Sequence, residues 1–267
     1  MTAGVGAPTA SATECLLDTN DNGVADAGDT DGGATGTGSP SLACGVNATA
    51  TGGNSTAVGA NAAATGFSNA TALGAFSQAT QTSSTAVGNN AQAFGFGSTA
   101  TGANSEAAAA RATAYGFSSG AFAIGSTAIG NASAATGEKS VSVGVNSTGS
   151  GESSVAVGDG SLSSGFSATA VGVAALASGT TAASYGANAR AIGDKAVSVG
   201  VNSLARGESS VAVGDGSAAL GSGSTAVGVA ANATNTNASA FGTDANALGI
   251  DSTAVGRFFD SHPDSRP

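Results

Sequence analysis

Glycine recurs at every seventh position from Gly88 to Gly256, with exceptions only at Ala109, Ala123 and Asn235. A fixed short period indicates a solenoid, in which the interior is built by stacking copies of one unit. The composition agrees, because a chain with 43 Gly, no Trp and 9% charged residues is too regular for an ordinary globular domain and too apolar for a disordered one.

Residues next to the glycines show that the true repeat is 14 residues long. Alternate glycines, namely Gly45, Gly59, Gly74 and every fourteenth residue after it, follow a bulky residue in almost every repeat, and we call them the major glycines. The minor glycines between them follow a mixed set with many hydroxyls. One half of each repeat thus has a regular bulky residue before its glycine and the other half does not. This pattern predicts a coil with two unlike sides.

Most major glycines are preceded by a large, a small and a large residue, as in Val155-Ala156-Val157-Gly158, and the middle residue is always Ala or Ser. Side chains alternate across a strand, so the large pair shares one face and the small residue lies on the other. We therefore predict an all-β solenoid with a very thin interior. The glycine turns the chain, because it adopts positive φ without steric cost.

The large residues before the major glycines predict an association surface. Repeated over the stacked coils, they would form a long apolar stripe on a monomer, and such stripes mark contact sites. We predict that the core of an oligomer contains Val58, Val87, Ile129, Val143, Val157, Val171, Val199, Val213, Val227 and Val255.

The chain divides into three segments. Residues 1–44 form an acidic, non-repetitive N-terminal segment, residues 45–256 the solenoid, and residues 257–267 an irregular tail. Inside the solenoid, the glycine spacing slips by one residue before Gly74, which predicts a one-residue insertion in a turn. Gly125 also stands outside the seven-residue spacing.

The strings Ser55-Thr56-Ala57-Val58-Gly59, Ser154-Val155-Ala156-Val157-Gly158 and Ser210-Val211-Ala212-Val213-Gly214 resemble the YadA-like head repeat of trimeric autotransporter adhesins. The resemblance covers the predicted solenoid. It implies a left-handed parallel β-roll, intertwined as a homotrimer and displayed on the outer membrane of a Gram-negative bacterium. It also implies a non-catalytic adhesin head that binds host extracellular-matrix proteins or cell surfaces and promotes self-agglutination.

Elements that accompany such heads are not recognisable in the sequence. No heptad stalk or neck follows Gly256, and Met1-Thr2-Ala3-Gly4 does not begin a signal peptide. No transmembrane helix is recognisable either. We expect that this chain is a fragment or a processed product, that its anchor and signal peptide lie elsewhere, and that this segment does not insert into a membrane.

An Asp-rich stretch at residues 18–29 matches the twelve-residue calcium loop, with Gly23 at its sixth position. It resembles the loops of dockerins and thrombospondin type 3 repeats, since Asp29 replaces the usual Glu and no helices flank it. The alternative is an acidic solvated linker. The candidate ligands of Ca²⁺ are Asp18, Asn20, Asn22, Val24 through its backbone carbonyl, Asp26 and Asp29.

Two cysteines, Cys15 and Cys44, bracket this stretch. In a surface protein they predict a disulfide worth about 3–4 kcal/mol through loop entropy. Free buried cysteines and an interchain bridge are the alternatives.

Other functions have little support in the sequence. The single histidine, His262, lies in the tail, so no Ser-His or Cys-His pair offers a credible general base and we expect no enzyme. A net charge of -10 disfavours nucleic acid as a partner. The small polar surface residues nominate no aromatic binding hot spot.

Two alternative functions remain open. An ice- or lattice-binding solenoid is suggested by a column of Thr residues three places before the major glycines, although Val141, Val155, Val197 and Val211 interrupt it. A phage tail-fibre section would share the same architecture.

Overall fold

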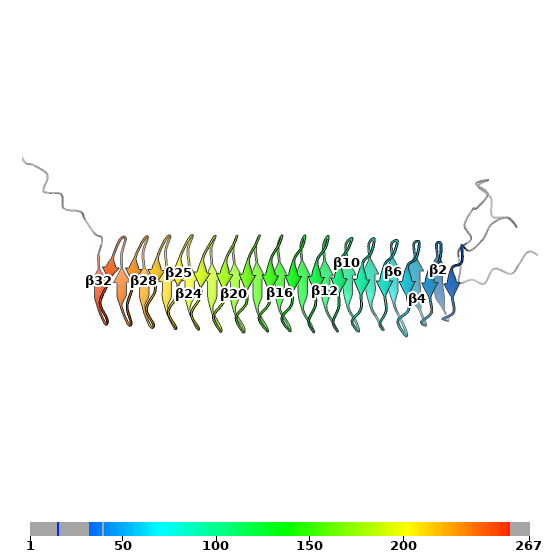
Figure 1. The fold of residues 1–267 in the computed structure, drawn as a ribbon, viewed down its shortest axis with the longest axis horizontal. Helices are drawn as coiled ribbons and strands as arrows, with labels where there is room; N and C mark the ends of the chain where they lie inside the picture. The colour runs from blue at the N-terminus through cyan, green and yellow to red at the C-terminus, as the bar shows by residue number, and fades with distance from the viewer. Residues whose placement is uncertain (1–14, 16–31, 39, 257–267) are drawn as a thin grey trace, which may run out of the picture. The chain divides into compact units, whose positions relative to one another are not determined.

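The computed structural model describes residues 15, 32–38 and 40–256. The chain divides into two compact units, Met1–Ala135 and Thr136–Pro267, and each is considered by itself. Within each unit, every coil contributes one strand that ends directly before a major glycine and one that follows it. The first kind forms the major sheet of that unit and the second kind its minor sheet (Figure 1).

The major sheet of the first unit has the order β2 (Ser41–Cys44), β4 (Ser55–Val58), β6 (Thr71–Leu73), β8 (Thr85–Val87), β10 (Thr99–Thr101), β12 (Thr113–Tyr115) and β14 (Thr127–Ile129). Its minor sheet has the order β1 (Thr35–Gly36), β3 (Thr49–Ala50), β5 (Ala63–Ala64), β7 (Gln78–Ala79), β9 (Gln92–Ala93), β11 (Glu106–Ala107), β13 (Gly120–Ala121) and β15 (Ala134–Ala135).

The second unit repeats this plan. Its major sheet has the order β16 (Val141–Val143), β18 (Val155–Val157), β20 (Thr169–Val171), β22 (Ala183–Tyr185), β24 (Val197–Val199), β26 (Val211–Val213), β28 (Thr225–Val227), β30 (Ser239–Phe241) and β32 (Thr253–Val255). Its minor sheet has the order β17 (Thr148–Gly149), β19 (Leu162–Ser163), β21 (Leu176–Ala177), β23 (Arg190–Ala191), β25 (Leu204–Ala205), β27 (Ala218–Ala219), β29 (Asn232–Ala233) and β31 (Asn246–Ala247).

Neighbouring strands in each sheet are parallel and in register, one repeat apart. Val141 pairs with Val155 and Val143 with Val157, so each column of the sequence repeat becomes a column on the surface or in the interior. This confirms the predicted all-β parallel solenoid of 14-residue coils.

The interior of each unit is filled by alanine and serine. Ala156, Ala170 and Ala212, the middle residues of their strands, are 0% exposed, and the serines at the corners are buried beside them. Many buried hydroxyls bond locally: Ser161 Oγ donates to the carbonyl O of Gly158 at 3.0 Å. The thin interior predicted from the Ala/Ser column is confirmed.

Two tight corners per coil turn the chain. At the corner after β18, the N–H of Ser161 donates to the carbonyl O of Gly158 at 3.3 Å, and Gly160 has φ 61°. A positive φ at the third of four residues is what a type II turn requires. The equivalent place in other corners is held mostly by non-glycine residues in the left-handed region, such as Asn146 and Lys139.

This corner geometry explains Gly125, which stands outside the glycine spacing. It occupies the left-handed corner position, two residues after Ala123, with φ 65°. Gly125 is therefore a regular part of the coil and not an irregularity.

The predicted one-residue insertion lies in a corner, as expected. Thr56 of β4 pairs with Thr71 of β6, a spacing of one residue more than the 14 between Thr71 and Thr85. Phe67 lies in the enlarged corner and is 88% exposed. The extra residue is thus accommodated outside the stack, and the register of the following coils is kept.

The solenoid begins earlier than the boundary at residue 45 that the sequence predicts. Its first strands are β1 and β2, which lie in the segment predicted to be non-repetitive. Leu42-Ala43-Cys44-Gly45 has the large-small-large-glycine order of the repeat, and Ala43 is fully buried. Leu and Cys replace the usual Thr or Val, which is why the boundary predicted from the sequence falls at Gly45 and leaves out the strands before it.

Candidate functional site

The ten residues predicted to form an oligomer core all lie on the outer face of the major sheets. Val143, Val157 and Val171 are half-buried in the single chain, as are the other valines of the set except Val255, which is exposed on the last strand. Ile129 is also exposed. Within one chain, therefore, the large apolar side chains lie outside and only small side chains lie inside.

A second apolar column lies beside the first in the second unit. Val145, Val173, Val201 and Val229 follow directly after major glycines and are exposed, with Val173 57% exposed. These four residues were not among the predicted contact residues, although the sequence has a Val after the major glycine in every second coil of this unit. We call Val143, Val157, Val171, Val199, Val213 and Val227 together with these four residues the valine face.

Aromatic side chains are exposed in both units, which corrects the expectation that the surface residues are small and polar. In the first unit, Phe96 and Phe117 lie at corners and Tyr115 lies on β12, where it is 59% exposed. Phe122 covers Gly120, because its ring occupies the space that a side chain at Gly120 would need. Glycine there makes room for the aromatic ring.

Several charged residues lie at the corners, where their electrostatic effects are small. Lys139 Nζ and Glu138 Oε1 form an ion pair at 3.1 Å, and both side chains are well exposed. The hydrogen bond and charge of Glu138, aided by the charge of Glu152, raise the pKa of Lys139 above its ordinary value. Exposed pairs of this kind contribute little to stability.

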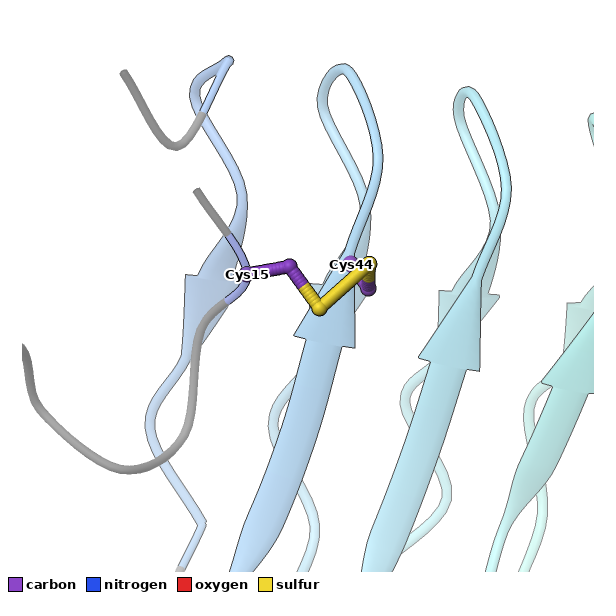
Figure 2. Close-up of a disulfide and its surroundings, with 2 residues drawn as sticks. All are labelled: Cys15 and Cys44. Atoms are coloured by element: carbon purple, nitrogen blue, oxygen red, sulfur yellow. A yellow bond between two sulfur atoms is a disulfide. The ribbon is translucent and has the colours of Figure 1, made fainter. Parts of the chain in front are cut away.

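The two cysteines form a disulfide in the structure. Cys44 ends β2, Cys15 lies beside it, and their Cα atoms are 4.8 Å apart (Figure 2). The N–H of Cys15 also donates to the carbonyl O of Ala43 at 3.1 Å. Cys15 is therefore attached to the first coil by both its backbone and its side chain.

The predicted calcium ligands and His262 lie outside the described residues. In residues 15, 32–38 and 40–256, no group of three or more His, Cys, Asp or Glu side chains is placed to hold a metal ion. None of the segments that the structure describes is a helix long and apolar enough to cross a membrane.

The Thr column that suggested lattice binding is regular only in part. Thr85, Thr99 and Thr113 pair in register on the major sheet of the first unit. The neighbouring column, however, contains Thr101 next to Tyr115, so the outer face there is not flat. In the second unit, valines take the Thr places in β16 and β18.

Each unit is thus a parallel β-solenoid with an alanine and serine interior and large apolar side chains outside, which is the architecture of a repetitive binding or spacer head. The YadA head domain repeat model matches residues 34–62, 68–91, 93–119, 121–147, 135–161, 191–217, 219–245 and 233–258. These matches cover most of the chain, and the chain belongs to this family of repeats. YadA-like heads are adhesin-type, bacterial cell-surface proteins.

A search of solved structures finds similarity to the crystal structure of the collagen-binding domain of the Yersinia adhesin YadA. The identity is 29%, the match covers 64% of this chain and 79% of that one, and the TM-score is 0.35. No curated protein sequence matches this chain.

Proposed function

We propose that the chain is the head of a homotrimeric, non-catalytic adhesin on the outer membrane of a Gram-negative bacterium. It attaches to host extracellular-matrix proteins or cell surfaces and promotes self-agglutination. The observation that supports this most is the valine face, because an apolar surface repeated over many coils is what an association interface offers. Membership of the YadA head repeat family supports the trimer.

Substituting Val199 with Asp is expected to dissociate the trimer. Val199 lies in the middle of the valine face and is half-buried in the single chain. An unpaired carboxylate buried in each subunit contact would cost about 3 kcal/mol, or roughly a hundredfold in the dissociation constant. Light scattering on the full chain should show three chain masses for the wild type and one for V199D.

The matched control is Leu204→Asp in the next strand, β25, where Leu204 lies on the outer face of the minor sheet. This variant should keep the trimer mass. A wild-type monomer, or a trimer in V199D with an unchanged circular dichroism spectrum, would contradict the proposed interface. Binding to immobilised matrix proteins should fall at least about a hundredfold in V199D, because three linked sites act by avidity.

We also propose that residues 18–29 bind one calcium ion through Asp18, Asn20, Asn22, Asp26, Asp29 and the backbone carbonyl of Val24. The support is the spacing of these oxygen ligands in the sequence. The shorter Asp29 at the last position is expected to give a dissociation constant of about 0.1–1 mM, as in extracellular modules.

Calorimetric titration of the full chain should detect this site. The double variant Asp18→Asn and Asp29→Asn is expected to abolish the heat of binding. Asp215→Asn, at a corner of the second unit, removes the same kind of charge outside the loop and should leave the heat unchanged. No heat above buffer in the wild type would show that the segment is a linker.

A further inference from the structure

The strand β2 begins the major sheet of the first unit. On one side it pairs with β4, from Ser41 opposite Ser55 to Cys44 opposite Val58. The strand order places no other strand of the described chain on its second side. Edge strands present N–H and C=O groups that another chain can pair with, and β2 carries no charged residue to discourage this.

Cys15 occupies part of this edge. Its N–H donates to the carbonyl O of Ala43, and its Cα lies 4.8 Å from that of Cys44, which is the spacing of neighbouring strands (Figure 2). Both features are those of a residue opposite Cys44 in a parallel strand preceding β2. Cys15 therefore takes the place of one residue of a preceding strand, and the disulfide holds it there.

A strand that fits the covered edge is β32. It ends the major sheet of the second unit and reads Thr253-Ala254-Val255-Gly256, the same four residues as Thr56-Ala57-Val58-Gly59, against which β2 pairs in its own chain. The outer edge of β32 faces away from its own coil. Gly256 N–H donates back to Phe241 O at 2.9 Å, and successive N–H groups of a strand point to opposite sides, so Val255 N–H points outward.

We propose that the Cys15–Cys44 disulfide is a redox-sensitive cap that keeps the edge of β2 from pairing with β32 of a second copy of this chain. A dithiol reductant transfers two electrons and two protons to the disulfide, which gives two thiols while the reductant forms its own disulfide. Of the disulfide and the hydrogen bond to Ala43 O, the hydrogen bond alone then remains, and Cys15 leaves the edge. Pairing of β2 with β32 of another copy is head-to-tail and leaves one β32 and one β2 edge of the pair unpaired, so further copies can add to either end.

Sedimentation of the full chain before and after treatment with dithiothreitol tests this proposal. On reduction, the weight-average mass should rise at least about twofold over that of the oxidised protein and grow with concentration. The double variant Cys15→Ser and Cys44→Ser should behave in the same way without reductant. The oxidised mass is the reference whatever its oligomeric state, so the result does not depend on the proposed trimer.

Two variants of β32 identify the pairing strand. Val255→Pro removes the outward N–H and is expected to prevent association of the reduced protein. Val255→Thr keeps this N–H and has a precedent in Thr101 of the same column, so it should associate as the wild type does. An unchanged mass after reduction, or association of reduced V255P as strong as that of the wild type, would overturn the proposal.

Discussion

Substituting Ala212 with Leu is expected to lower the free energy of unfolding by about 3 kcal/mol, at the upper end of what overpacking usually costs. Ala212 is the middle residue of β26 and is 0% exposed. Its partners in register on the neighbouring strands are Ser198 and Ala226, which are also fully buried. The buried neighbours of Ala212 therefore leave no room for a leucine side chain at this position.

The cost is high because the interior cannot rearrange. In an ordinary core, large side chains change rotamer to accept an added group, whereas alanine and serine have almost no such freedom. The two sheets of the unit must therefore separate at this coil. Each coil contacts only its neighbours, so the damage is expected to spread from β26 as local opening.

The matched control is Val213→Leu, at the next residue of the same strand. Val213 is half-buried and points outward, and Leu73 occupies the equivalent place in β6. Its effect should stay below about 1.5 kcal/mol. Urea unfolding followed by circular dichroism measures both changes, and equal midpoints for A212L and V213L would contradict the thin interior.

The interior was the most predictable part of this fold, and the reason is steric. Only Ala or Ser fits between two such close layers, so every repeat shows the constraint at the same place, as at Ala156 and Ser198. The outward columns are less constrained within one chain, because no second layer of the same unit packs against them and many side chains fit. Val145 and Val173 were missed for this reason, since their column also contains Asp159 and Ala187.

The corners were predictable in position but not in residue type. The left-handed corner residue is Asn in many coils, as its tolerance of positive φ would suggest, but the same place holds Phe76, Lys139 and Ala132. Each of these residues accepts some backbone strain to keep the hydrogen bonds between coils, for example from Phe76 N–H to Ala60 O at 2.9 Å. Stacking thus overrides local preference, and sequence alone cannot show where this happens.

Major and minor glycines are expected to differ sharply in their tolerance of alanine. Gly200 directly follows β24 with φ +131°, and a Cβ there would lie 2.5 Å from the carbonyl O of Gly214 in the next coil. Backbone in this region is almost restricted to glycine, and a non-glycine residue costs about 1–3 kcal/mol in strain alone. With the added steric clash, Gly200→Ala should lower the free energy of unfolding by about 3 kcal/mol.

The matched substitution is Gly207→Ala at the next minor glycine. A Cβ there would also collide with the next coil, at the carbonyl O of Gly221, but the φ of Gly207 is not in the left-handed region. Equivalent corners already hold Ala109, Ala123 and Asn235, so the fold accepts a Cβ at this place, and we infer that a small backbone shift relieves the contact. The same shift is expected to limit the cost at Gly207 to about 1 kcal/mol.

Every major glycine from Gly45 to Gly256 is preserved along the chain, with φ between 115° and 137°, whereas the minor positions vary. This contrast indicates two different reasons for a repeated glycine. The major glycines adopt a backbone conformation that other residues avoid, whereas the minor glycines lie close to the next coil, and a small shift of the backbone can relieve that contact. Urea unfolding of both variants distinguishes the reasons. A G207A variant as unstable as G200A would mean that the close approach between coils, and not the value of φ, requires glycine at both corners.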